Sequence, residues 1–159
     1  MTPRFTLHHA SCVLLGASGV LLRGRSGAGK SRLAMALIEA AQGEGTFARL
    51  VADDRVWLAA TPDGRLIARA PDEIAGLAEL RGRGIVRLAI EPLCRVRLVV
   101  DVVADGAIER MPTRAQLVTH IESVSLPRQP VAASDPVGAA RLVRRALEDT
   151  LAGTLPEGV

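Results

Sequence analysis

The segment Gly24–Ser31, GRSGAGKS, decides the fold prediction, and it holds the one lysine of an arginine-rich chain. Gly24, Gly29, Lys30 and Ser31 match the pattern G-x-x-x-x-G-K-[ST] without a gap. Glycines let successive N–H groups surround an anion, and an ammonium is a compact charge where a guanidinium is a planar fork. The hydroxyl at the last position suits Mg²⁺. We therefore predict a phosphate-binding loop made of Gly24, Arg25, Ser26, Gly27, Ala28, Gly29, Lys30 and Ser31.

The flanks of this loop indicate an α/β fold. Val20–Arg23 is a short apolar strand that leads into the loop. From Ser31 the apolar residues follow helical spacing as far as Gly43. The face that this spacing predicts to be buried comprises Leu33, Ala34, Leu37, Ile38 and Ala41. Arg49–Ala52 is predicted to be the next strand, so a strand, a helix and a strand follow one another.

The rest of the chain predicts mostly short strands. These are one or two strands in residues 7–15, a hairpin in residues 56–69 around the turn TPDG, and strands at 85–90 and 95–103. Residues 74–80 read as a short helix or a loop. Ser134, Asp135 and Pro136 predict the capped start of a closing helix. Its predicted buried stripe is Val137, Ala140, Val143, Leu147 and Leu151. The prediction is an α/β domain with a mixed sheet and flanking helices.

Composition narrows the class of protein. The chain has 159 residues, 48% of them hydrophobic and only 2% aromatic, which predicts one domain with an aliphatic core. No apolar run reaches the roughly 18 residues of a transmembrane helix. Residues 12–22 lead into the glycine loop and not into a cleavage site, so no signal peptide is predicted. Cys12 and Cys94 make no CxxC pair, which favours a reduced, cytoplasmic setting. A net charge of +3 with almost no aromatic residues argues against a nucleic-acid partner.

Two adjacent carboxylates, Asp53 and Asp54, follow the strand 49–52. Ligands of open α/β sheets bind outside the carboxyl ends of the strands, so we expect this pair to lie near the phosphates. One carboxylate is suited to hold Mg²⁺ and the other to take a proton from an attacking hydroxyl. The alternative is a solvated Asp-Asp turn without a role.

Two further stretches are candidates for the site. Adjacent residues of a strand face opposite ways, so at most one of His8 and His9 is expected to point into it. An edge pair of histidines with no role is the alternative. Residues 79–84, ELRGRG, combine arginines that can clamp a phosphate with glycines that allow close approach. The alternative for this stretch is a surface turn.

Taken in this order and spacing, a histidine, GRSGAGKS, LVADD and ELRGRG resemble the catalytic domain of HPr kinase/phosphorylase. The resemblance implies a P-loop fold of the phosphoenolpyruvate carboxykinase-like type and a protein-serine kinase that uses ATP and Mg²⁺ to phosphorylate the phosphocarrier HPr. It also implies a cytoplasmic homohexamer and a reverse phosphorolysis activity. One kinase domain over residues 1–159, without a separate N-terminal domain, is expected for a short form of the family.

The resemblance carries roles onto single residues. His9 stands fifteen residues before Gly24 and is the histidine that corresponds to the family's. Asp53 corresponds to the proton acceptor, and Arg81 of the E-x-R-G signature lies near the transferred phosphate. Lys30 holds the phosphates, while Ser31 and Asp54 are the expected metal ligands. The catalytic residues predicted in this way are Asp53, His9, Arg81 and Lys30.

The chain departs from the family pattern at two further places. Arg32 stands where the family often has Glu, and the family's late R-P-G-R-N loop is absent, with LPRQP at residues 126–130 the nearest segment. These departures keep two other functions open. One is a P-loop kinase for a small molecule, and the other is a nucleotide-binding sensor without catalysis.

Overall fold

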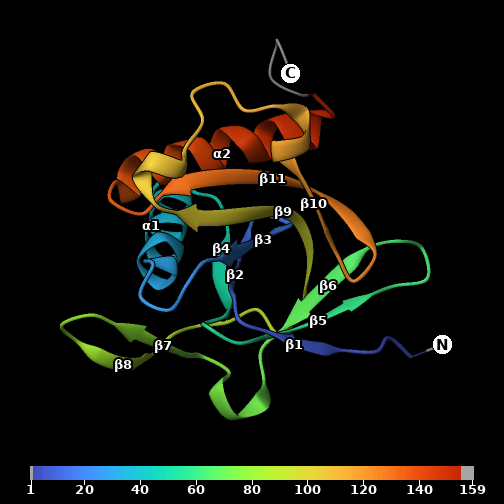
Figure 1. Ribbon diagram of the computed structural model, residues 1–159. Coiled ribbons are helices and arrows are strands. Elements are labelled where there is room, and N and C mark those ends of the chain that lie inside the picture. Colours follow the sequence, from blue (N-terminus) through green and yellow to red (C-terminus); the bar gives the residue numbers. More distant parts are fainter. Residues whose placement is uncertain (1, 155–159) are drawn as a thin grey trace.

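A computed structural model describes residues 2–154, and a nine-stranded mixed sheet is its main element (Figure 1). The order β1-β5-β6-β9-β3-β2-β4 runs across the sheet, while β11 pairs with β9 and β10 pairs with β11. These strands are β1 (Thr6–His8), β2 (Ser11–Leu15), β3 (Ser18–Arg23), β4 (Ala48–Ala52), β5 (Val56–Ala60), β6 (Leu66–Arg69), β9 (Cys94–Val103), β10 (Val118–Ile121) and β11 (Val124–Ala132).

The remaining elements cover the sheet or extend from it. The two α-helices are α1 (Lys30–Gly43) and α2 (Pro136–Ala152), and the 3₁₀ turns are η1 (Asp72–Ile74), η2 (Asp105–Ala107) and η3 (Arg114–Leu117). A separate hairpin of β7 (Leu77–Leu80) and β8 (Gly84–Arg87) extends away from the main sheet (Figure 1). The predicted mixed α/β fold is confirmed. No helix within residues 2–154 has the length and apolar character needed to cross a bilayer.

The strand directions bring distant segments to one edge of the sheet. β2 lies between β3 and β4 and is antiparallel to both, so β3 and β4 run in the same direction. β9 is parallel to β3, and β11 is parallel to β9. The carboxyl ends of four strands and the start of β2 therefore meet at the same edge. The glycine loop leaves β3 at this edge, and the Asp53–Asp54 pair leaves β4 there.

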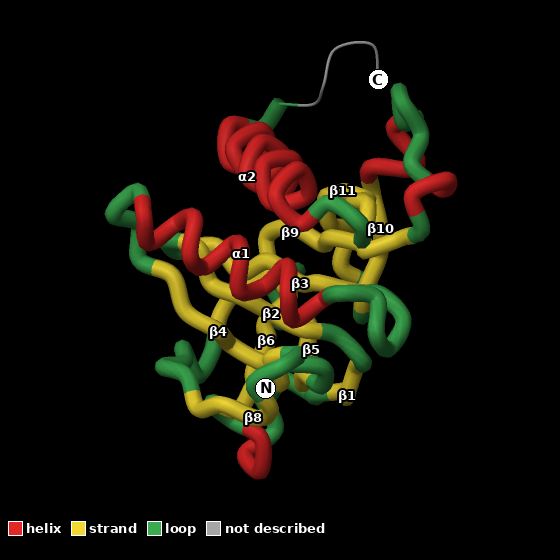
Figure 2. Tube along the Cα trace, turned by 90° about the vertical axis from the view of Figure 1, so that its left-hand side faces the viewer, coloured by secondary structure: helices red, strands yellow, loops and turns green. Residues whose placement is uncertain are grey.

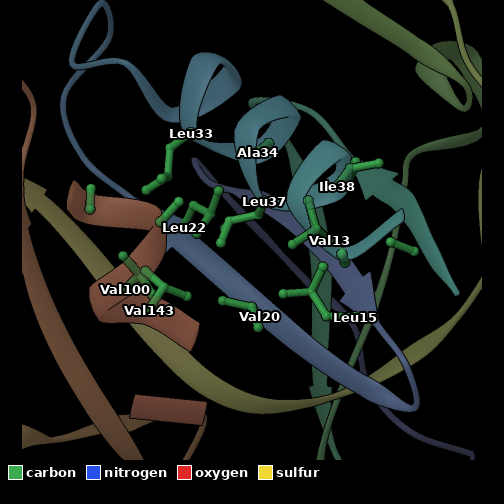
Figure 3. Close-up of a cluster of buried hydrophobic side chains, with 14 of the residues drawn as sticks. Val13, Leu15, Val20, Leu22, Leu33, Ala34, Leu37, Ile38, Val100 and Val143 are labelled. Atoms are coloured by element: carbon green, nitrogen blue, oxygen red, sulfur yellow. The ribbon is translucent and has the colours of Figure 1, made fainter. Parts of the chain in front are cut away.

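Side chains of the central strands are buried on both faces, as expected for strands covered from two sides. On one face α1 and α2 pack side by side over β2, β4, β9 and β11 (Figure 2). Figure 3 shows this cluster, with Leu33, Leu37 and Ile38 of α1 against Val13 and Leu22 of the sheet. All five residues predicted to form the buried face of α1 are buried. The alternate residues of the strands, such as Cys12 and Leu21, form a second core on the other face.

Local differences from the prediction have local causes. Asp135 caps α2 as predicted, since its side chain accepts a hydrogen bond of 2.9 Å from the Gly138 N–H. The predicted stripe of α2 was wrong at both ends, because Val137 is 63% and Leu151 is 54% exposed. Its buried residues are Ala139, Ala140, Val143 and Leu147. The buried residues all lie between positions 139 and 147, so burial is confined to the middle of the helix.

Candidate functional site

The glycine loop has the backbone geometry of an anion cradle. Gly27 and Gly29 have φ of 79° and 102°, a region that other residues rarely adopt. A Cβ on Gly24 would lie 3.1 Å from the Val102 carbonyl oxygen, so this position has little room for a side chain. α1 follows directly at Lys30, and no side chain caps its first turn. The free N–H groups and the positive end of the helix are thus available to an anion in the cleft.

Lys30 is held inside the site and is only 5% exposed. Its Nζ donates hydrogen bonds to the carbonyl oxygens of Gly24 at 2.9 Å and Arg25 at 3.1 Å. The same nitrogen lies 3.4 Å from His9 Nε2 and 3.7 Å from Asp54 Oδ1. The lysine is therefore tethered to its own loop and faces His9 and Asp54.

The two carboxylates point in different directions. Asp53 Oδ1 accepts hydrogen bonds from Ser31 Oγ at 2.7 Å and Ser11 Oγ at 3.0 Å, and its Oδ2 accepts one from the Glu79 N–H at 3.1 Å. Asp54 has a left-handed backbone with φ of 63°, and its Oδ1 lies 3.2 Å from His9 Nε2. The serine that we expected to share a metal with Asp54 is thus hydrogen-bonded to Asp53. Asp54 faces Lys30 and His9 instead.

The two histidines lie in different surroundings, as expected for the adjacent pair, although only His8 belongs to a strand and His9 lies in the bend after β1. His9 lies between Lys30 and Asp54. His8 lies at the end of β1, where its Nε2 is 2.8 Å from Glu122 Oε1 in the turn between β10 and β11. Of the adjacent pair, only His9 contacts the site residues.

A cleft of about 1100 Å³ lies at the glycine loop and the carboxylate pair, and the predicted site residues His9, Gly24 and Arg25 are not part of its lining. The residues predicted from the sequence that line it are Ser26, Gly27, Ala28, Gly29, Lys30, Ser31, Asp53, Asp54, Glu79 and Arg81. The alternative of a surface turn for residues 79–84 is correct in part: Arg81 lies in the exposed turn of the β7–β8 hairpin, and it also lines the cleft. Asp105 and Ser134 line the opposite end, where Ser134 Oγ donates to Asp105 Oδ2 at 2.5 Å.

The sequence prediction missed these last two residues and Ser11. Asp105 and Ser134 follow the carboxyl ends of β9 and β11, which reach this edge only because both strands run parallel to β3. That pairing has no local signal in the sequence. Ser11 does have a local signal in the sequence, because it is a polar residue at the start of an apolar run.

The donor atoms near the loop suit a hard cation. Ser31 Oγ lies at the start of α1, and the carboxylates of Asp53 and Asp54 line the same cleft; Mg²⁺ prefers such oxygen ligands together with those of substrate phosphates. Among residues 2–154, no group of three or more His, Cys, Asp or Glu side chains is placed to hold a metal ion.

The cysteines lie outside the cleft, in the second core. Cys12 and Cys94 are free and buried, with their Sγ atoms 3.5 Å apart, a contact that the sequence did not predict. The hydrogen bond with Cys94 and burial both raise the pKa of the Cys12 thiol. A thiol with a raised pKa is a poor nucleophile, so Cys12 is not a candidate for covalent chemistry.

Comparison with known proteins gives a family that agrees with the resemblance seen in the sequence. The family model described as HPr Serine kinase C-terminal domain matches residues 1–143. The chain belongs to this family. The match reaches well past residues 9–84, which carried the resemblance seen in the sequence.

Individual relatives give the same result. HPr kinase/phosphorylase from Cupriavidus necator is 32% identical over 160 residues, covering 94% of this chain and 46% of that protein. The protein of the same name from Burkholderia cenocepacia is 35% identical over 127 residues, covering 74% of this chain and 37% of that protein. The chain thus spans less than half the length of these relatives. A solved structure of the Hpr(Ser) kinase/phosphatase from Coxiella burnetii is similar with a TM-score of 0.72 at 25% identity, covering 92% of this chain and 99% of that one.

Proposed function

We propose that this protein is an ATP- and Mg²⁺-dependent protein-serine kinase that phosphorylates the phosphocarrier HPr. The observation that carries the proposal is the meeting of Lys30 with Asp53 and Asp54 in one cleft at the mouth of the glycine loop. Membership of the HPr serine kinase family supports HPr as the acceptor. A phosphoenolpyruvate carboxykinase-like type of P-loop fold, a reverse phosphorolysis activity and assembly as a homohexamer are parts of the same proposal. Light scattering tests the last of these.

In the proposed reaction the protein mainly positions groups and stabilises charge. The loop N–H groups and Lys30 bind the phosphates, and Arg81 stabilises the charge of the phosphoryl group in transfer. The seryl oxygen forms a bond to the γ-phosphorus while the bond to the β–γ bridging oxygen breaks, and ADP leaves. Ser31 and Asp54 would hold Mg²⁺, which supplies neutralising charge for the phosphate oxygens.

We assign the seryl proton to Asp53. Its Oδ1 already accepts hydrogen bonds from two serine hydroxyls, the same chemical group as the acceptor. Asp54 lies 3.7 Å from the lysine Nζ, on the phosphate side of the cleft, which suits a role beside the metal. His9 lies between Lys30 and Asp54 and orients both.

The test is a transfer assay with γ-labelled ATP, Mg²⁺ and purified HPr, in which acid-stable label separates phosphoserine from phosphohistidine. We expect Asp53→Asn to lower transfer about a thousandfold because it removes the proton acceptor, with ATP affinity changed only a few-fold. Asp54→Asn is the comparison at the neighbouring position: because it removes a proposed metal ligand, we expect it to raise the Mg²⁺ concentration that transfer requires.

Three results of this assay would contradict parts of the proposal. Transfer within a few-fold of wild type in Asp53→Asn contradicts the assignment of the base. Loss of transfer in Asp54→Asn with Asp53→Asn active would exchange the two roles. Wild-type protein that binds ATP and leaves HPr unlabelled would contradict the acceptor.

A further inference from the structure

Ser11 is a buried polar residue for which the proposed reaction has no role so far. It is the first residue of β2 and is fully buried. Among the described residues only Ser11, Ser18 and Lys30 are buried polar or charged side chains. A buried hydroxyl is costly unless it is hydrogen-bonded, so its partners indicate its purpose.

The Ser11 hydroxyl joins the two carboxylate residues. Its Oγ donates to Asp53 Oδ1 at 3.0 Å and accepts from the Asp54 backbone N–H at 3.0 Å. An amide N–H can only donate, so Ser11 Oγ must accept from Asp54, which leaves its proton for the carboxylate of Asp53. One side chain therefore fixes an Asp53 oxygen and the Asp54 backbone together.

The backbone at this point needs such support. Asp54 has a φ of 63°, in the left-handed region that few residues other than glycine, asparagine and aspartate adopt. A hydrogen bond of 2.8 Å from the Arg55 N–H to the Asp53 carbonyl oxygen closes the tight turn around it. This turn sends the Asp54 carboxylate towards Lys30 and His9 while Asp53 faces Ser31. The Ser11 hydroxyl is the side chain that holds the turn from the inside.

The sheet register brings the serine to this turn. Cys12 pairs with Ala52 and Val13 with Leu50, so Val51 is an extra residue in β4 opposite the start of β2. An extra residue bends a strand and re-aims the side chains beyond it, and here Asp53 directly follows the end of the strand. Ser11 itself pairs with Leu22 of β3, close to the glycine loop.

We propose that Ser11 is a positioning residue for phosphoryl transfer: its hydroxyl keeps Asp53 and Asp54 pointing in different directions, one towards the acceptor and one towards the lysine. It is buried beneath the cleft residues and is not part of the cleft lining. The kinetic test below rests on the proposed kinase function, whereas the spectroscopic test does not.

Ser11→Ala and Ser11→Thr are the informative variants, because the first removes the hydroxyl and the second keeps it. Ser18→Ala is the matched control, a buried serine at the opposite end of the β2–β3 pair. We expect Ser11→Ala to lower kcat about 10- to 100-fold per nucleotide-binding site, with the Kd for ATP within about twofold. Counting sites by ATP titration separates this loss from a smaller folded fraction. Ser11→Thr should keep most of kcat, and Ser18→Ala all of it.

The spectroscopic readout needs no acceptor. In ¹H–¹⁵N spectra of the protein without ligand, the Asp54 amide proton should shift upfield in Ser11→Ala, since it loses its hydrogen bond, and stay in place in Ser18→Ala. An unchanged Asp54 amide overturns the proposal. So does a kcat per site within twofold of wild type in Ser11→Ala, or Ser11→Thr as impaired as Ser11→Ala. Failure of HPr phosphorylation in the wild type would leave the amide result standing.

Discussion

Two clusters of charged residues flank the glycine loop. They differ in how closely the charged groups within each cluster are paired. The sheet cluster consists of Arg23, Asp101 and Arg128. Arg23 binds both carboxylate oxygens of Asp101, at 2.8 and 2.9 Å, and Arg128 donates to the same carboxylate and, at 2.7 Å, to the Gln116 carbonyl oxygen. Only 15% of the Asp101 side chain is exposed. Both of its carboxylate oxygens therefore accept hydrogen bonds from arginines.

The cleft cluster consists of His9, Lys30, Asp53 and Asp54. Its ionic contacts to Asp54 are longer, 3.2 Å from His9 and 3.7 Å from Lys30, and 54% of the Asp54 side chain is exposed. Basic side chains around carboxylates thus form a closed structural network on one side of the loop and an open site on the other. The comparison teaches that two carboxylates with basic neighbours can differ in availability: Asp54 is exposed and loosely held, so it is open to a ligand, whereas Asp101 is not. It also gives Arg128 a structural role, although Arg128 lies in the segment nearest to the family's late loop.

The largest expected effect is that of Lys30→Ala. The cleft cluster loses its cation, and the phosphates lose the ammonium beside the loop, so we expect HPr phosphorylation to fall at least about a thousandfold. Radiolabel transfer measures the loss, and nucleotide titration shows how much of it is binding. Arg23→Ala is the comparison in the sheet cluster. It should lower the free energy of unfolding, while the folded protein keeps most of its transfer activity. Equal losses of transfer in the two variants would remove the distinction between the clusters.

A smaller effect is expected at Arg81, an exposed arginine at the cleft for which no ion pair is found among the described residues. Arg81→Ala should lower kcat about a hundredfold with ATP affinity nearly unchanged, because its guanidinium meets charge that develops during transfer. Steady-state kinetics with HPr measure this.

Arg83→Ala is the matched control, two residues further along the same hairpin turn and not part of the cleft lining. It should change kcat by less than about twofold. If both variants lose the same activity, the hairpin acts through its shape, and the assignment of Arg81 to the transferred phosphate is wrong.

The sequence predicted those parts of the site that depend on neighbours along the chain. The loop carries its own glycines, lysine and helix start, and the two aspartates follow a recognisable strand, so both were found. The partners of those groups were not, because they depend on which strands pair. Ser11 meets Asp53 through the β2–β4 register, and Ser134 reaches the cleft through the parallel pairing of β11 with β9. The hydrogen bond from Ser31 to Asp53, where we expected a shared role with Asp54, depends on the left-handed backbone of Asp54, which no pattern in the sequence predicts.

The smallest effect on activity is expected from Asp101→Asn in the sheet cluster. Burial raises the pKa of Asp101, but the hydrogen bonds and charges of Arg23 and Arg128 outweigh burial and hold this pKa below its usual value. A carboxyl with a lowered pKa in the folded state adds stability above its unfolded pKa of about 3.9, and the contribution is lost as the pH falls through the folded value. Asp101→Asn should therefore lower the free energy of unfolding by about 1–3 kcal/mol at pH 7.

Denaturant unfolding of both proteins at pH 7 and at several values below 4 tests this. The difference in free energy should shrink steadily over the acid range, because the wild-type carboxyl becomes protonated there and resembles the amide. Transfer to HPr at neutral pH and low temperature should stay within about twofold, since the cleft cluster keeps all its members. A difference that does not depend on pH would mean that packing, and not the ionised carboxylate, gives the sheet cluster its strength. A large loss of transfer in folded Asp101→Asn would show that the closed cluster and the open one act as a single unit across the glycine loop.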